Sequence, residues 1–222
     1  YVEDGNELRN TIARNLLLCP SLSHKATLGG LVPAAEPSGL QATGHRCCLL
    51  GVPSHSDSDY DEQSGLYSLS ATNDFVENHI VGHMNALYVN HQGQRYYGIG
   101  AAYGKVCILA SPFGLVEGNV FHGNAGFGFY VNVAFPSRVL TAADGYVDAW
   151  ASCLPFDMAS GAENGAPYTV ARHTEYHNDF AAGGYDLGDI SFDGLISAFN
   201  NKGLYLKTYR RGLGAGPFCS NC

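Results

Sequence analysis

The stretch LVEGNVFHGNAGFGFYV, residues 115–131, decides the fold. An apolar pair leads to an Asn, a small or polar step follows, and Gly or Ala then precedes an apolar triplet. The same phrase recurs as FVENHIVGHMNALYV over 75–89 and as DGLISAFNNKGLYL over 193–206. Short apolar runs separated by Asn or Gly corners are typical of a coiled sheet, in which each coil buries its apolar face against the next coil. The repeat therefore predicts an all-β solenoid.

Asn residues recur in pairs five positions apart. The pairs are Asn10 and Asn15, Asn73 and Asn78, and Asn119 and Asn124. Asn at a corner tolerates left-handed backbone, and Asn side chains in stacked coils can bond one another in a ladder. The spacing predicts a short strand between two corners. An amphipathic helix over residues 6–18 is the alternative for the first pair, but its Asn residues and its Leu triplet fit a coil better.

The spacing of matching tyrosines gives an expected coil length. Tyr88 and Tyr130 are 42 positions apart, which corresponds to two coils of roughly 20 residues each. Tyr205 lies 75 positions further on, so an insertion is expected before the third phrase.

Two segments lack the repeat. Residues 33–65 and 134–168 are rich in Pro and Gly and have no periodicity, so we expect irregular loop insertions there, of the kind that often carries function. The chain 1–222 is then one β-helix domain, and we expect it to be a fragment of a longer polypeptide whose other modules are its partners.

Composition excludes some classes of function. The net charge is −8 with only 12 Lys and Arg residues, which disfavours a nucleic-acid surface. No apolar run approaches the roughly 20 residues that a membrane-spanning helix needs, so no membrane insertion is predicted in this segment.

Seven cysteines are spread along the chain: Cys19, Cys47, Cys48, Cys107, Cys153, Cys219 and Cys222. This distribution is typical of an extracellular or cell-surface protein with some disulfides, and the odd number leaves one thiol over. Cys219-Ser-Asn-Cys222 is similar to half a zinc site or a redox pair. Ordinary disulfide cysteines near a module boundary are the favoured interpretation, because a zinc site needs a second ligand pair.

Candidate metal residues are few. Asp57, Asp59 and Asp61 alternate like the start of a calcium loop, but the glycine and glutamate that such a loop requires are absent. No cofactor is predicted, and an irregular calcium site is the alternative to a solvated acidic loop. In His173-Thr-Glu-Tyr-His177 the Glu does not directly follow the first His, as the metalloprotease pattern requires, so surface or corner histidines are expected.

The best enzymatic constellation is acidic. Asp186, Asp189 and Asp193 lie close in sequence, and Arg172 could supply a base or an anchor for an acidic sugar. β-Helical enzymes that cleave polysaccharides use paired acids, or acids with calcium and a basic residue. The competing interpretation is that these Asp residues serve corners, where Asp is common for backbone reasons.

Aromatic residues offer a third kind of site. Tyr96, Tyr97, Tyr103, Tyr130 and Tyr205 could present flat faces to sugars, although about half are expected in the core.

The order of motifs resembles the β-helix region of fibrocystin-like surface proteins and of the cell-migration-inducing hyaluronidase family. Four elements carry the resemblance: Glu3-Asp4-Gly5 with Asn10, Asn15 and Leu16; Gly65–Leu69 with Asn73–Val89; Gly114-Leu115 with Gly118-Asn119, His122 and Asn124; and Asp193–Leu195 with Ala198-Phe199, Asn201 and Gly203.

The resemblance implies a right-handed parallel β-helix in an extracellular or cell-surface setting, and no catalytic residue is carried over from it. Three functions remain open. The favoured one is a structural or adhesive segment, for example of a fibre or appendage that self-assembles. The alternatives are an extracellular depolymerase of hyaluronan-type polysaccharides and a glycan-binding module.

Overall fold

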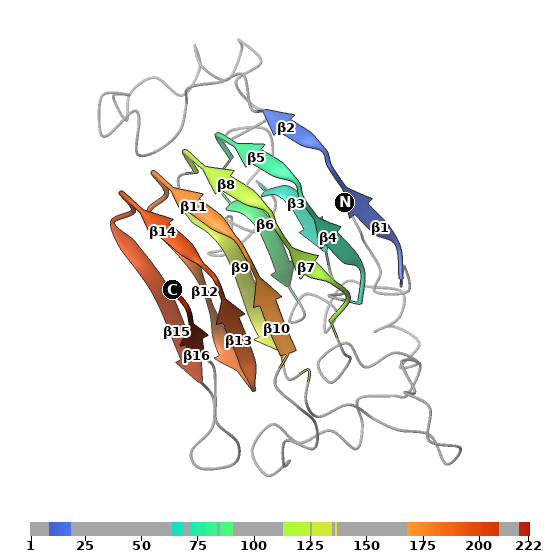
Figure 1. Ribbon diagram of the computed structural model, residues 1–222, viewed down its shortest axis with the longest axis vertical. Helices are drawn as coiled ribbons and strands as arrows, with labels where there is room; N and C mark the ends of the chain where they lie inside the picture. The colour runs from blue at the N-terminus through green and yellow to red at the C-terminus, as the bar shows by residue number, and fades with distance from the viewer. Residues whose placement is uncertain are drawn as a thin grey trace, which may run out of the picture.

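The computed structural model describes residues 9–18, 64–68, 72–83, 85–90, 113–124, 126–134, 136, 168–208 and 218–222. The regular secondary structure within these ranges consists of strands alone, and the strands form three parallel sheets (Figure 1). No helix in the described part of the chain could cross a membrane. The predicted insertions 33–65 and 134–168 lie outside the described residues except at their edges, where strands begin or end.

The chain visits the three sheets in turn, one strand at a time. Sheet 1 contains β1 (Thr11–Ala13), β4 (Asp74–Val76), β7 (Val116–Glu117), β10 (Tyr168–Ala171), β13 (Ile190–Asp193) and β16 (Phe218–Ser220). Sheet 2 contains β2 (Leu16–Leu18), β5 (His79–Val81), β8 (Val120–His122), β11 (Thr174–Tyr176) and β14 (Ile196–Ala198). Sheet 3 contains β3 (Ser64–Ser68), β6 (Asn85–Asn90), β9 (Phe127–Ala134), β12 (Phe180–Leu187) and β15 (Lys202–Thr208).

Each strand pairs in parallel with the strand three places further along the chain, so successive coils stack on one another (Figure 1). This is the arrangement of a β-solenoid. Coils 1 to 5 are each made of one strand from every sheet, and β16 begins coil 6. Residues 11–18 form β1 and β2, so the helical alternative for the N-terminal segment is wrong.

The expected coil length needs one correction. Tyr88 pairs directly with Tyr130, so their 42-residue separation is one coil rather than two. Coils 4 and 5 follow without interruption, and their equivalent residues are 22 positions apart. The extra residues between coils 2 and 3 lie between Asn90 and Val116, a third interruption that sequence analysis missed. Its Tyr, Ile and Leu content resembles that of the coils, so composition did not reveal it.

The first corner, between sheets 1 and 2, has a fixed backbone form. The residue before the ladder position is left-handed in each coil, for example Arg14 (φ 58°), Glu77 (φ 53°) and Arg172 (φ 54°). Asn tolerates left-handed backbone, but at these corners the residue before it takes that conformation. The Asn that follows is freed to point its amide into the coil, where it bonds the neighbouring coil.

Asn side chains form a ladder at the first corner, as predicted. Asn119 Oδ1 accepts hydrogen bonds from the backbone N of Asn78 (2.8 Å) and from Asn78 Nδ2 (3.1 Å). Asn78 Oδ1 accepts the equivalent pair from Asn15 (3.1 and 3.0 Å). Each amide thus satisfies buried backbone groups and ties one coil to the next.

A second ladder runs along the corner between sheets 2 and 3. Asn178 Oδ1 accepts from the backbone N and the Nδ2 of Asn124 (3.0 and 2.8 Å), and Asn200 Oδ1 accepts from the backbone N of Asn178 (2.7 Å). Asn119 is equivalent to Asn78 and not to Asn73. The first two Asn pairs flank strands of sheet 1, whereas the third pair flanks a strand of sheet 2. In each pair the two Asn residues enclose one three-residue strand, as predicted.

The core lies inside the coils. Its side chains come in rows of one residue per coil, such as Phe75 and Val116 in sheet 1, Ile80 and Phe121 in sheet 2, and Leu87 and Phe129 in sheet 3. Removing this apolar area from water is the main stabilising contribution, since each such side chain gains roughly 1.5–3 kcal/mol on burial.

Candidate functional site

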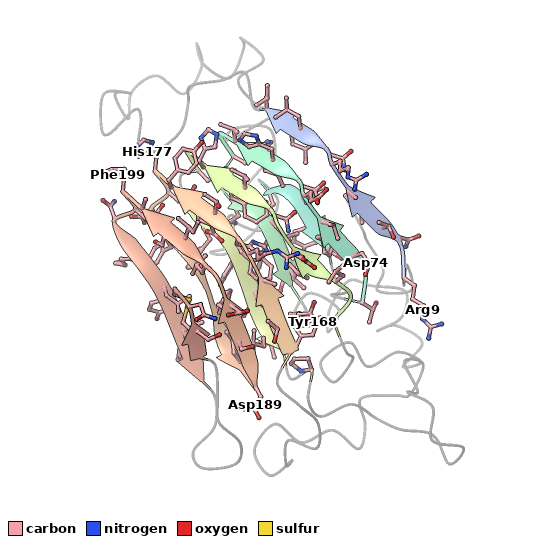
Figure 2. All side chains as sticks on the ribbon, in the orientation of Figure 1. Arg9, Asp74, Tyr168, His177, Asp189 and Phe199 are labelled. Atoms are coloured by element: carbon pink, nitrogen blue, oxygen red, sulfur yellow. A yellow bond between two sulfur atoms is a disulfide. The ribbon has the colours of Figure 1, made fainter. Side chains whose placement is uncertain are left out.

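The acidic residues singled out in the sequence do not meet at one point. Asp189 precedes β13 and is buried, whereas Asp193 ends the same strand; Figure 2 shows Asp189 at one tip of the sheet. Four residues of extended chain put their α-carbons about 13 Å apart, beyond the roughly 5–10 Å of glycosidase carboxyl pairs. The side chain of Asp186 lies outside the described part of the structure.

Arg172 and Asp193, by contrast, do come together. Arg172 forms an ion pair with Glu117 of the preceding coil, while Glu117 and Asp193 occupy equivalent register positions on either side of Ala171. We call Glu117, Arg172 and Asp193 the charged corner. It contains two of the predicted catalytic candidates, Arg172 and Asp193, together with Glu117, which the sequence did not single out.

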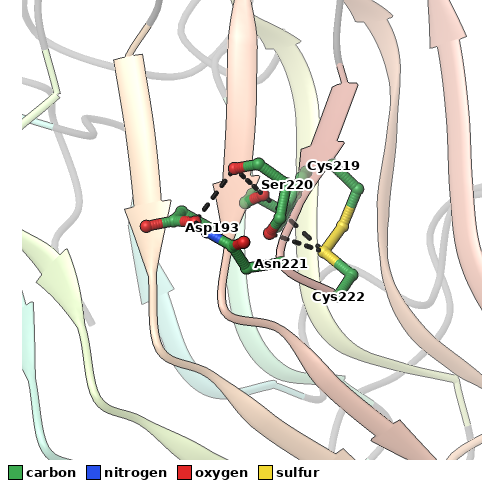
Figure 3. Close-up of a disulfide and its surroundings, with 6 residues drawn as sticks. Asp193, Cys219, Ser220, Asn221 and Cys222 are labelled. Atoms are coloured by element: carbon green, nitrogen blue, oxygen red, sulfur yellow. Dashed lines mark hydrogen bonds between the residues drawn. A yellow bond between two sulfur atoms is a disulfide. The ribbon is translucent and has the colours of Figure 1, made fainter.

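The carboxylate of Asp193 is already well supplied with donors. Asn221 Nδ2 donates to its Oδ1 at 2.7 Å and Ser220 Oγ at 2.9 Å (Figure 3). These two hydrogen bonds, helped by the positive charge of Arg172, hold the pKa of Asp193 below its ordinary value. A carboxyl group that remains ionised cannot act as a general acid near neutral pH. Asp193 is therefore excluded as a general acid, and the contacts of the charged corner join neighbouring coils.

A disulfide lies beside the charged corner. Cys219 and Cys222 are bonded to each other, with their α-carbons 6.1 Å apart (Figure 3). This agrees with the disulfide prediction for the pair, and neither thiol is free to bind zinc in this state. The other candidate cysteines, Cys19, Cys47, Cys48, Cys107 and Cys153, lie outside the described residues, as do Asp57, Asp59 and Asp61. The described residues contain no cluster of three or more metal-ligating side chains.

An aromatic ladder follows the outer face of sheet 3. Its members are Tyr67, Tyr88, Tyr130, Phe127, Phe180 and Tyr205. Tyr130 stacks on Tyr88, with ring centroids 4.5 Å apart, and on Phe127 at 4.4 Å. Stacking takes up ring faces that a sugar would otherwise contact, so the ladder joins coils and Tyr130 is a poor sugar platform. Tyr96, Tyr97 and Tyr103 lie outside the described residues.

A buried titratable pair, not recognised from the sequence, occupies coil 4. His173 takes the ladder position, with its Nε2 3.4 Å from Asn119 Nδ2, and Glu175 takes the inward position that Phe121 holds one coil earlier. Their side chains are 2% and 1% exposed, and His173 Nδ1 is 3.9 Å from Glu175 Oε1. Among the described residues, none lies within hydrogen-bond geometry of His173 Nδ1 or of either carboxyl oxygen of Glu175.

Burial decides the charge of this pair. It lowers the pKa of His173 to about 4 and raises the pKa of Glu175 well above its usual value. Although the distance would allow an ion pair, desolvation of both groups favours a neutral imidazole beside a protonated carboxyl. The carboxyl group fits because Gly128 has no side chain: a Cβ there would overlap Glu175 Oε2.

The segment His173–His177 therefore serves the coil. It forms a strand between two corners, so the two histidines do not share a helix face as in a metalloprotease. His173 is at a corner, as expected, but buried, and His177 is an exposed corner residue. The sequence does carry a signal for this pair. When VARHTEY (170–176) is aligned with LVEGNVFH (115–122) at the corner, His173 matches Asn119 and Glu175 matches Phe121.

We expect stability to fall with rising pH above about 6.5 because of Glu175. Its folded pKa is raised, so its contribution is complete below the unfolded value of about 4.5 and is lost as the pH rises through the folded value. His173, lowered from 6.5 to about 4, acts in the opposite sense and loses stability as the pH falls across that range. The two slopes oppose one another between about 4.5 and 6.5, and above this window the loss from Glu175 continues alone until the pH passes its folded pKa.

Urea unfolding at pH 6.5, 7.5 and 8.5 measures this slope. Glu175→Gln should remove most of it, because the amide keeps the shape of the side chain and does not titrate. Asp193→Asn is the matched control, since the pKa of that carboxyl is lowered and it is ionised throughout this range. Equal slopes for the native chain and Glu175→Gln would contradict a protonated Glu175.

The sequence matches no family model, no curated protein and no solved structure.

Proposed function

We propose that this chain is a rigid structural or adhesive segment of a large extracellular or cell-surface protein, such as a fibre or appendage. The observation that carries the proposal is the continuity of its ladders. Two Asn ladders and an outer aromatic ladder connect neighbouring coils along the stack. A solenoid joined in this way is stiff along its axis, and each coil contacts only its neighbours, so length can be added end to end.

The motif order supports the finer parts of this proposal. It resembles fibrocystin-like surface proteins and the cell-migration-inducing hyaluronidase family, which favours an extracellular setting. We also propose a right-handed coil, because connections between parallel strands of one sheet are right-handed in nearly all proteins.

A polysaccharide depolymerase is the second candidate, favoured by the meeting of Glu117, Arg172 and Asp193 at the charged corner. Three features weigh against it. Arg172 is already neutralised by Glu117, Asp193 is held ionised, and Asp189 lies at the other end of β13. A net charge of −8 would also repel an anionic glycan.

The test is incubation with hyaluronan and with a pectin-like polymer, with and without calcium, followed by gel analysis of polymer length. The scaffold proposal predicts no shortening. Cleavage that Asp193→Asn abolishes and Asp189→Asn preserves would overturn it and place a depolymerase at the charged corner. A glycan array run with the same protein would reveal a binding module by retention without cleavage.

A further inference from the structure

Two histidines meet on the outer face of sheet 2. His79 begins β5 and His122 ends β8, the neighbouring strand of the next coil. Their Nε2 atoms are 2.9 Å apart and their ring centroids 5.0 Å apart. Both side chains flank core-facing residues, Ile80 and Phe121, and therefore point away from the core.

Strand register and ring stacking hold this pair in place. Strands β5 and β8 pair at three consecutive positions, which fixes the diagonal relation of the two histidines. The ring of His122 also stacks on Tyr176 of the following coil, with centroids 4.3 Å apart and planes 9° from parallel. The two nitrogens are thus brought together by backbone register and by stacking, so little side-chain freedom would be lost if both bound one ligand.

The two rings face each other almost head-on across this contact, and a small rotation of both rings brings the two nitrogens onto one metal ion. In the absence of metal, one Nε2–H donates to the other Nε2. Metal–imidazole bonds are about 2.0–2.1 Å long, so two ligands at a right angle are about 2.9 Å apart, whereas tetrahedral ligands are about 3.4 Å apart. Right-angled nitrogen ligands are typical of square-planar or octahedral Cu²⁺ and Ni²⁺.

We propose that His79 and His122 form a two-histidine site for a divalent transition metal of the Cu²⁺ or Ni²⁺ kind, each binding through Nε2. Because the described residues hold no cluster of three ligating side chains, water would complete the coordination. The negative net charge of the chain favours cation binding in general, and the histidine pair supplies the selectivity. This site is independent of the scaffold proposal.

Isothermal titration with Ni²⁺ tests the site, because Ni²⁺ does not oxidise free thiols. His79→Asn and His122→Phe should each weaken binding by about tenfold or more, since each removes one of two protein ligands. Phe at position 122 preserves the stack on Tyr176, and melting temperatures would establish that both variants fold. His177→Asn, which removes an exposed histidine at the nearby corner, is the matched control and should leave the affinity within about threefold.

Two outcomes would overturn the proposal. One is Ni²⁺ binding that is equally tight in the native chain and in the double variant His79→Asn/His122→Phe, which would place the metal elsewhere. The other is Zn²⁺ binding more tightly than Ni²⁺, which would contradict right-angled ligands. In support, the electron paramagnetic resonance spectrum of one added Cu²⁺ should show coupling to two nitrogens, and only one in either single variant.

Discussion

Asn119→Ala is expected to destabilise the folded chain by about 3–5 kcal/mol, because a buried hydrogen-bond network loses its central member. The Asn119 side chain is completely buried; its oxygen accepts two hydrogen bonds from Asn78, and its nitrogen donates to the carbonyl of Phe75 at 2.8 Å. Truncation leaves the backbone N–H of Asn78 without its acceptor inside the coil and removes one of the donors to the carbonyl of Phe75. Each unsatisfied group costs about 1–3 kcal/mol, to which the cavity adds.

Urea unfolding of three variants would measure this effect. Asn15→Ala removes the exposed first member of the same ladder and should cost only about 1 kcal/mol. Asn119→Asp keeps an accepting oxygen but buries a carboxyl group that faces the carbonyl of Phe75, so it should cost clearly more than Asn15→Ala. If Asn119→Ala and Asn15→Ala cost the same, the ladder does not carry the stability assigned to it.

Gly128→Ala is the second large effect, with an expected loss of about 3 kcal/mol or more from overpacking. The added Cβ would overlap the carboxyl of Glu175 and lie 2.8 Å from the backbone oxygen of Ala181. Movement of the backbone is restricted, because β9 pairs with β6 on one side and with β12 on the other.

The double variant Gly128→Ala/Glu175→Ala separates the two contacts. Removing the carboxyl empties the space that the new methyl group requires, so the double variant should be more stable than Gly128→Ala alone. The backbone contact with Ala181 remains, and recovery should therefore be partial. A double-mutant cycle gives the coupling free energy, expected to exceed about 1 kcal/mol for groups in direct contact. Strictly additive losses would show that Glu175 does not occupy the space beside Gly128.

The repeated phrase predicted the architecture well because it records a backbone requirement. Each coil needs a short strand, a corner and an Asn that bonds the next coil, and Asn78 and Asn119 mark that need directly. The phrase could not predict that the residue before the ladder Asn has left-handed backbone. The residues at that position, Arg14, Glu77 and Gly118, share no side-chain property.

Coil 4 was missed because its residues depart from the phrase at the two informative positions. His173 replaces Asn and Glu175 replaces an apolar residue, so the segment lacks the signature of the repeat and its two histidines resemble a metal-binding pattern instead. The interior accommodates Glu175 through a glycine 47 positions earlier in the chain, and only the pairing of coils shows that relation.

Which of the predicted site residues meet depends on how the coils pack, and the spacing of residues along the sequence does not reveal that packing. Asp189 and Asp193 are close in sequence but lie at opposite ends of one strand, whereas Glu117 and Arg172 are distant in sequence and form an ion pair. Likewise Tyr130 was recognised as an aromatic candidate, but its stacking on Tyr88 and Phe127 follows from register.

The interruptions between coils have a consequence for the order of folding. Equivalent residues in coils 4 and 5 are 22 positions apart, whereas those in coils 1 and 2 are 63 apart. Closing the longer loop costs roughly 1 kcal/mol more in chain entropy, and a stack can nucleate at any pair of coils and then grow. The C-terminal coils are therefore the natural nucleus, and coil 1 joins last onto an edge that the others have already formed.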